Sequence, residues 1–176
     1  MEPNNELELI DQVSKWAAYN FSHKRDPAWG VVEEIGEAAH ACLKKFQGIR
    51  GYDETRFHLD FADSLGDAMI FLSDWCSLHQ AYFKFNRNEK MVMVEDHDAI
   101  MAHVLQCASA MFRYPAMLTP TLNEGDVCSV VAQRVCTALE YWATFHKMDL
   151  KLITASVWIG VRKRDWIKFP KNGIDA

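Results

Sequence analysis

The spacing of apolar residues constrains the fold of this chain more than any other feature. Apolar side chains recur every three or four positions along most of its length, which is the period of one face of an α-helix. The 176 residues include only 8 glycines and 5 prolines, so few positions interrupt the pattern. We therefore expect an all-α protein, a helical bundle of about five or six helices that forms a single domain over residues 1–176.

Capping and helix-breaking residues set the expected helix boundaries. The first four expected helices cover about 5–21, 27–48, 53–83 and 96–113. A fifth begins after the Thr121-x-x-Glu124 capping box and ends near residue 146, and a sixth begins after residue 149. Asp26 is expected to cap the second helix, and Met91–Val94 to form a connection. The expected core positions are Leu7, Ile10, Val13, Ala17 and Phe21; Val32, Ile35, Ala39, Leu43 and Phe46; Phe57, Phe61, Leu65, Phe71, Leu72 and Trp75; and Leu150, Ile153, Val157 and Val161.

Composition and charge exclude several classes of protein. The 19 basic and 24 acidic side chains give a net charge of -5, which argues against a surface that binds a nucleic acid polymer. The longest stretch without charged residues, Ala99–Phe112, is shorter than the roughly 20 apolar residues of a membrane span. The N-terminus has no signal-peptide pattern, so we expect a cytoplasmic protein without membrane contact. The five cysteines include no C-x-x-C pair and lie among apolar residues, and we expect reduced core thiols.

Acidic residues form two groups on helices that otherwise have a core-forming pattern. Glu33 and Glu34 each share a helix face with Glu37, and Asp60, Asp63 and Asp67 share a face of the next helix, with Asp74 two turns further on. Like charges at this spacing cost about 0.2–0.5 kcal/mol per pair, and no lysine or arginine lies between Leu59 and Trp75. Two such helices facing each other would form an oxygen-only cage, which selects Mg²⁺ or Mn²⁺.

The two acidic groups also resemble a known pair of motifs. Glu33-Glu34-x-x-Glu37, followed by the segment Asp63–Leu72, is similar to the signature of the MazG-like all-α nucleoside triphosphate pyrophosphatases. Trp29-Gly30 and the segment Val161–Trp166 add to the resemblance, which covers about residues 16–76 and 135–173. It implies a MazG-like four-helix core, with Phe85–Asn123 as an extra helical segment. The family pattern has a glutamate at the position of Ser64, which cannot supply a charged ligand. Which two of Asp60, Asp63 and Asp67 would bind metal is therefore open, with Asp63 and Asp67 favoured.

The resemblance implies hydrolysis of a nucleoside triphosphate to the monophosphate and pyrophosphate. The implied metal is Mg²⁺, or Mn²⁺, on Glu34, Glu37, Asp63 and Asp67, and Glu33 or Glu34 would orient or deprotonate the attacking water. Trp29, which opens the acidic helix, is the candidate to stack on the base, and the candidate phosphate contacts are the basic side chains Lys44, Arg162, Lys163 and Arg164. The resemblance also implies a homodimer or homotetramer.

Two other functions remain open from the sequence. The chain could be a non-catalytic helical module that binds nucleotides or a protein partner, which the serine at position 64 favours. The dipeptide His97-Asp98, with His58 and His79 upstream, is also compatible with a metal-dependent phosphohydrolase of the HD type. That alternative explains neither of the two acidic groups.

Overall fold

Six α-helices make up most of the protein in the computed structural model, which describes residues 3, 5–21, 25–85, 96–113, 124–171 and 173–174. The helices are α1 (Glu6–Asn20), α2 (Pro27–Phe46), α3 (Glu54–Leu78), α4 (His97–Arg113), α5 (Glu124–Phe145) and α6 (Leu150–Val161). The described residues contain no β-strand, so the expected all-α class is confirmed. Met91–Val94 and Thr121 lie outside the described residues.

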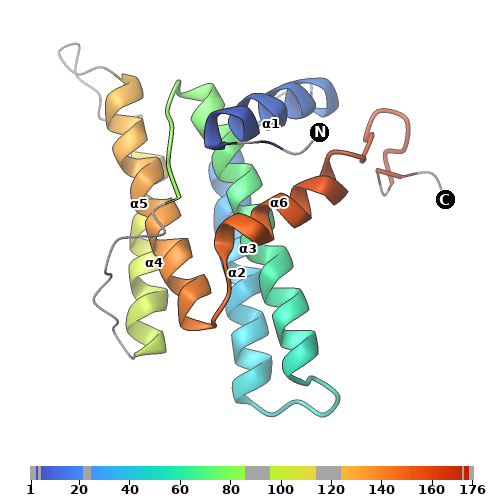
Figure 1. Ribbon diagram of the computed structural model, residues 1–176, viewed down its shortest axis with the longest axis vertical. Helices are drawn as coiled ribbons and strands as arrows, with labels where there is room; N and C mark the ends of the chain where they lie inside the picture. Colours follow the sequence, from blue (N-terminus) through green and yellow to red (C-terminus); the bar gives the residue numbers. More distant parts are fainter. Residues whose placement is uncertain are drawn as a thin grey trace.

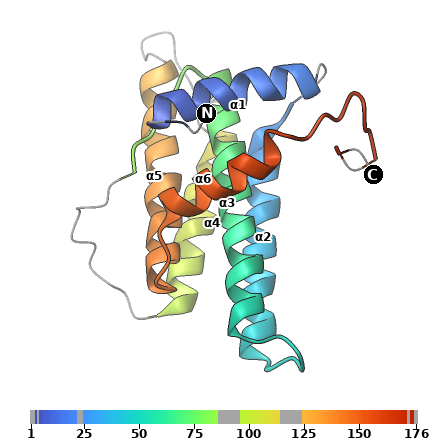
Figure 2. The same ribbon diagram turned by 45° about the vertical axis from the view of Figure 1, so that its right-hand side comes forward.

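The helices are arranged around α3. Helices α2 and α3 form an antiparallel hairpin, and α4 and α5 lie beside it as a second pair (Figure 1). Helix α1 lies across one end of the hairpin, and α6 crosses the face of α3 (Figure 2). The turn between α2 and α3 contains Gly48 and Gly51, whose φ angles of 62° and 80° are accessible to glycine at little cost. None of the described helices is long and apolar enough to cross a membrane.

Helix α3 supplies the centre of the core. Phe57, Phe61, Leu65, Leu72 and Trp75 are buried as the sequence predicts, in a cluster to which all six helices contribute. The helix ends at Leu78 rather than near residue 83. Its end has a physical cause, because Gln80 has a φ of 51°, which is incompatible with a continuing α-helix. Burial of this apolar face, worth about 25 cal/mol per Å², fixes the orientation of the polar face.

The predicted apolar face of α2 is confirmed at Ile35, which is buried, but the buried face is rotated from the predicted one by part of a turn. Leu43 and Phe46 are exposed, whereas Val31, Ala38 and Cys42 are buried. Adjacent apolar pairs along α2 fit two neighbouring helical stripes, and the packing of α2 against both α3 and α4 selects one of them. Leu7 and Phe21 of the predicted α1 stripe are likewise exposed. The side chains of Asn5, Asp53, Asp96 and Asp149 accept from backbone N–H groups in the first turns of α1, α3, α4 and α6, but Asp26 makes no such bond at the start of α2.

Candidate functional site

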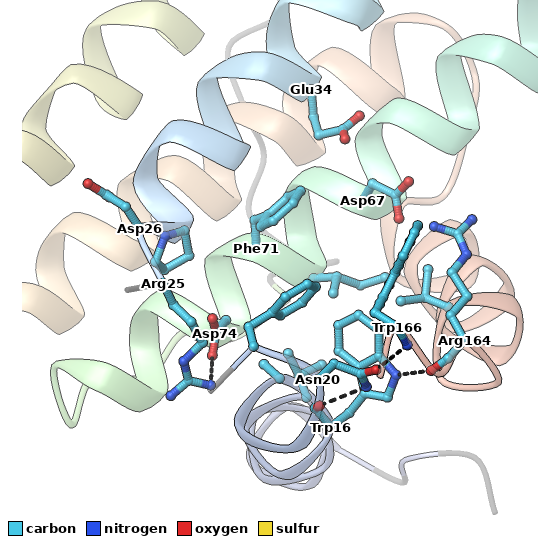
Figure 3. Close-up of a pocket in the computed structure, with 16 residues that line it drawn as sticks. Trp16, Asn20, Arg25, Asp26, Glu34, Asp67, Phe71, Asp74, Arg164 and Trp166 are labelled. Atoms are coloured by element: carbon cyan, nitrogen blue, oxygen red, sulfur yellow. Dashed lines mark hydrogen bonds and ion pairs between the residues drawn. The ribbon is translucent and has the colours of Figure 1, made fainter. Parts of the chain in front are cut away.

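A pocket of about 570 Å³ lies between α1, the first half of α2, the second half of α3 and the segment that follows α6 (Figure 3). Four aromatic rings, those of Trp16, Phe21, Phe71 and Trp166, contribute to its wall. Polar groups lie at two places: Glu34, Asp67 and Arg164 at one end, and Arg25 with Asp74 at the other. A largely apolar cavity with a few charged groups is the usual form of a small-molecule site.

Hydrogen bonds hold the segment after α6 against α1 and so complete the pocket wall. The Trp166 backbone N–H donates to Asn20 Oδ1 at 2.7 Å, and Trp16 Nε1 donates to the Arg164 carbonyl oxygen at 3.0 Å. Asn20 Nδ2 in turn donates to the Trp16 carbonyl oxygen at 3.0 Å. The first two bonds join residues at opposite ends of the sequence, and they place Arg164 and Trp166 beside the acidic end of the pocket (Figure 3).

The two acidic groups face each other across the α2–α3 interface, with Glu34 at the centre. Burial raises the pKa of Glu34 from its ordinary value of 4.5 to about 8, and Asp67 is the next largest cause, followed by Glu37. Glu33 and Asp63 raise this pKa further. Carboxylates from both helices therefore lie close enough to act on the charge of Glu34. We call Glu34, Glu37, Asp63 and Asp67 the acidic cluster.

Asp67 is the α3 member of the acidic cluster whose side chain lines the pocket. Burial raises its pKa from 3.8 to about 6, and the carboxylates of Asp63 and Glu37 raise it as well. The positive charge of Arg164 lowers the pKa, and Figure 3 shows the guanidinium turned toward Asp67. Arg164 is therefore the member of the basic segment that lies at the site. Arg162 and Lys163 do not line the pocket.

Two of the α3 aspartates have partners outside the acidic cluster. Asp60 forms an ion pair with Arg56 at 2.9 Å, and Asp74 forms one with Arg25 at 3.0 Å. Buried Ser64 donates its hydroxyl to the Asp60 backbone oxygen at 3.0 Å, as serines in helices often do. Of the three aspartates that the sequence leaves open, Asp63 and Asp67 are the two whose charges raise the pKa of Glu34, whereas Asp60 is paired with Arg56.

The donor chemistry of the acidic cluster fits a hard divalent cation. All its ligand atoms are carboxylate oxygens, and a cation would relieve the repulsion that raises the pKa of Glu34. Among the described residues, no three of these carboxylates lie within 4.8 Å of one another. Glu37 and Asp63 are exposed, so their side chains are free to rotate toward a shared ion.

The other predicted site residues lie outside the large pocket. Lys44 lines a smaller cavity of about 260 Å³ between α2 and α3, together with Glu37 and Asp63. Its ammonium group lies 5.3 Å from the centre of the Tyr52 ring. Glu33 is exposed and does not line the pocket.

Trp29 is also away from the pocket that the sequence predicts it to serve. Its side chain is 64% exposed, and its ring packs against Phe112 of α4 with a centroid distance of 5.0 Å. The side chain lies there because Trp29 and Glu34 face different sides of α2. The aromatic rings beside the acidic cluster are instead those of Phe71 and Trp166.

The residues of the HD-type alternative are not brought together. His58 and His79 are near opposite ends of α3, about 30 Å apart from the helical rise of 1.5 Å per residue. His58 lies 3.1 Å from Glu54, and His79 lies 3.0 Å from Glu124. The side chain of Asp98 is fully exposed. A single metal centre cannot include both upstream histidines.

Replacing Asp74 by alanine is expected to destabilise the fold. Arg25 and Asp74 are only 18% and 8% exposed, so Asp74→Ala leaves a guanidinium without its partner in a buried position. The expected loss is about 2–3 kcal/mol, or a melting temperature lower by roughly 4–12 °C. Thermal unfolding followed by circular dichroism measures it. A loss no larger than that of Asp11→Ala, which removes an exposed ion pair with Lys15, would contradict a stabilising role.

Comparison of the chain with protein-family profiles, with curated proteins and with solved structures found no match. We therefore infer function from the residues and the geometry of the site.

Proposed function

We propose that the protein is a metal-dependent nucleoside triphosphate pyrophosphohydrolase, which converts a nucleoside triphosphate to the monophosphate and pyrophosphate. One observation carries the proposal. Carboxylates from two neighbouring helices converge at one end of an aromatic pocket, and Glu34 and Asp67 belong to both the acidic cluster and the pocket wall. The resemblance of the two acidic motifs to the MazG-like enzymes supports the same function.

The polarity of the pocket suggests how a nucleotide would lie. The phosphates would lie at the end formed by Glu34, Asp67 and Arg164, where the guanidinium can donate to phosphate oxygens. The base would lie among the aromatic rings, since stacking of a base on an aromatic side chain contributes about 1–3 kcal/mol. The Arg25–Asp74 pair at the far end offers hydrogen-bond donors and an acceptor to the base edge.

The residues of the acidic cluster would have distinct roles. Mg²⁺ or Mn²⁺ bound by these carboxylates would neutralise phosphate charge and lower the pKa of a bound water. Glu34 and Asp67, whose side chains line the pocket, would hold this charge next to the substrate. Glu34 is better placed than exposed Glu33 to orient the attacking water. Arg164 would stabilise negative charge on the phosphates.

The decisive experiment measures pyrophosphate. Purified full-length protein with Mg²⁺ or Mn²⁺ is incubated with a panel of common and modified nucleoside triphosphates. We expect equimolar nucleoside monophosphate and pyrophosphate from at least one of them. If every substrate stays intact, or if orthophosphate and a diphosphate form instead, the proposed reaction is wrong.

The affinity for Mg²⁺ is expected to rise with pH. With a pKa of about 8, Glu34 holds a proton at neutral pH in the metal-free protein, and Mg²⁺ must displace it. Asp67 has a pKa of about 6 and is therefore mostly ionised above pH 6, so Mg²⁺ displaces little proton from it there. Affinity should therefore increase about tenfold per pH unit from pH 6 to pH 8 and then level off. Isothermal titration calorimetry in buffers of different ionisation enthalpy counts the released proton. Equal affinity at pH 6 and pH 8 would contradict the site.

A non-catalytic nucleotide-binding protein is the second candidate. The observation that favours it is Ser64, whose hydroxyl is directed to the Asp60 backbone oxygen and so adds no ligand to the acidic cluster. In that case the chain would bind a nucleoside triphosphate in the presence of Mg²⁺ and leave it unhydrolysed. Calorimetric binding combined with the pyrophosphate assay separates the two functions.

A further inference from the structure

Three potential metal ligands meet away from the acidic cluster. The ligand atoms of Cys42, His97 and His146 all lie within 4.8 Å of one another, and Cys42 Sγ is 3.8 Å from His146 Nε2. Cys42 belongs to α2, His97 is the first residue of α4, and His146 directly follows α5. The start of α4 and the end of α5 lie at the end of the bundle opposite α1 (Figures 1 and 2).

Aromatic side chains enclose this group and restrict the two histidine rings. Phe57 and Phe61 pack against His146 with centroid distances of 5.0 and 4.7 Å, and Phe46 packs against His97 at 4.9 Å. Trp142 Nε1 donates to His97 Nε2 at 3.3 Å, so this nitrogen is the unprotonated one, and a metal bound there would displace the indole N–H from its lone pair. Rings held in place by packing lose little side-chain entropy when they bind a metal.

The two imidazoles suit a metal that binds nitrogen, whereas the Cys42 thiol, whose pKa burial raises to about 12, must lose its proton to bind. Burial lowers the pKa of His146 to about 4 and lowers that of His97, so both imidazoles are neutral at pH 7, the form that ligates metals. Lys45, a nearby cation, forms an ion pair with Glu54 at 2.8 Å. The side chain of His97 is 16% exposed, which leaves a route from solvent.

We propose that Cys42, His97 and His146 form a zinc site, with three protein ligands and a water as the fourth. One sulfur and two imidazole nitrogens are the ligand set that a borderline ion such as Zn²⁺ prefers, whereas Mg²⁺ prefers oxygen. On binding, the Cys42 thiol loses its proton to solvent and the thiolate forms the bond to the metal. The ion would link α2, α4 and α5, and it would do so independently of the acidic cluster.

Cobalt distinguishes this site from the acidic cluster. The metal-free full-length protein is titrated with Co²⁺, which replaces Zn²⁺. A thiolate ligand gives a near-ultraviolet charge-transfer band, and tetrahedral geometry gives strong visible bands; a carboxylate site gives neither. We expect the charge-transfer band to saturate at one Co²⁺ per chain and to disappear when Zn²⁺ is added.

Matched variants assign the band to its ligands. Cys42→Ser and His97→Asn are expected to abolish it. Cys107→Ser is the control, because Cys107 Sγ lies 3.7 Å from His103 Nε2 but has no third ligand among the residues that the structure describes, and the band should remain. Cys128→Ser tests the group formed by His79, Glu124 and Cys128, and there too the band should remain.

Three results would overturn the proposal. The first is a wild-type protein without the charge-transfer band, and the second is a band that survives in Cys42→Ser. The third is loss of the band in Cys128→Ser, which would place the metal in the other group. Because Cys42 is buried and its replacement can impair folding, circular dichroism accompanies each titration. If Cys42→Ser is unfolded, His97→Asn replaces it in the test: loss of the band supports the site, and a band that remains overturns it.

Discussion

Glu34→Gln is expected to abolish pyrophosphate release while the chain remains folded. Glutamine keeps the shape of the side chain but removes the charge at the centre of the acidic cluster. A metal ligand contributes several kcal/mol to stabilising transition-state charge, so activity should fall at least about a thousandfold. The pyrophosphate assay measures the loss. A variant that retains a tenth of the activity would exclude Glu34 from the reaction.

The same substitution is expected to stabilise the metal-free protein above neutral pH. The pKa of Glu34 is about 8 in the folded chain against an ordinary 4.5, so ionisation of this side chain favours the unfolded state as pH rises from about 4.5 to 8. Glu34→Gln removes that cost. Its melting temperature should exceed that of the wild type at pH 8 and match it near pH 4. Asp11→Asn, which alters only an exposed ion pair, should show neither effect.

The local parts of the structure could be predicted from the sequence. The all-α class and the core residues of α3 follow from apolar spacing, because helical period and burial act within a few residues of one another. The proximity of Glu34 to Asp67 could also be expected from short-range sequence patterns. Carboxylates at spacings of three and four share one helix face, and a short turn brings the next helix alongside.

The pocket could not be predicted, because its walls come from opposite ends of the chain. Trp16 bonds to the backbone of Arg164, and Asn20 to that of Trp166, contacts for which no local pattern exists. Trp29 was expected to contact the base because it adjoins the acidic motif in sequence. In the fold it packs on Phe112 instead, since a helix turns neighbouring side chains in different directions.

The predicted face of α2 was wrong at two of its five positions, Leu43 and Phe46, for a related reason. Val31 and Val32 are adjacent, as are Ala38 and Ala39, and Cys42 and Leu43. Each pair offers one residue to either of two stripes, and periodicity alone cannot choose between them. Packing against α4 as well as α3 places Cys42 inside, next to His97 and His146. The sequence indicated that this thiol is buried, but its two histidine neighbours appear only in the fold.

Gly66→Ala is expected to destabilise the protein and to disturb the pocket. Gly66 is buried where α3 contacts α6, and a β-carbon there would overlap the side chain of Val157, lying 2.7 Å from its Cβ. Overpacking costs typically 1–3 kcal/mol, against about 1 kcal/mol gained from the better helix former. Because the segment after α6 carries Arg164 and Trp166, displacement of α6 should also lower nucleotide affinity. Thermal unfolding and calorimetry measure the two effects.

Gly36→Ala provides the matched control, because among the described residues the added β-carbon meets no atom within 4 Å apart from its chain neighbours and the backbone of its own helix, and the residue is exposed. This variant should be more stable by about 0.5–1 kcal/mol. The double variant Gly66→Ala/Val157→Ala frees space for the new methyl group, so its loss of stability should be smaller than the sum of the single losses by at least about 1 kcal/mol. If the losses in the free energy of unfolding are additive instead, the added methyl group does not clash with Val157. Gly66 then does not set the distance between α3 and α6.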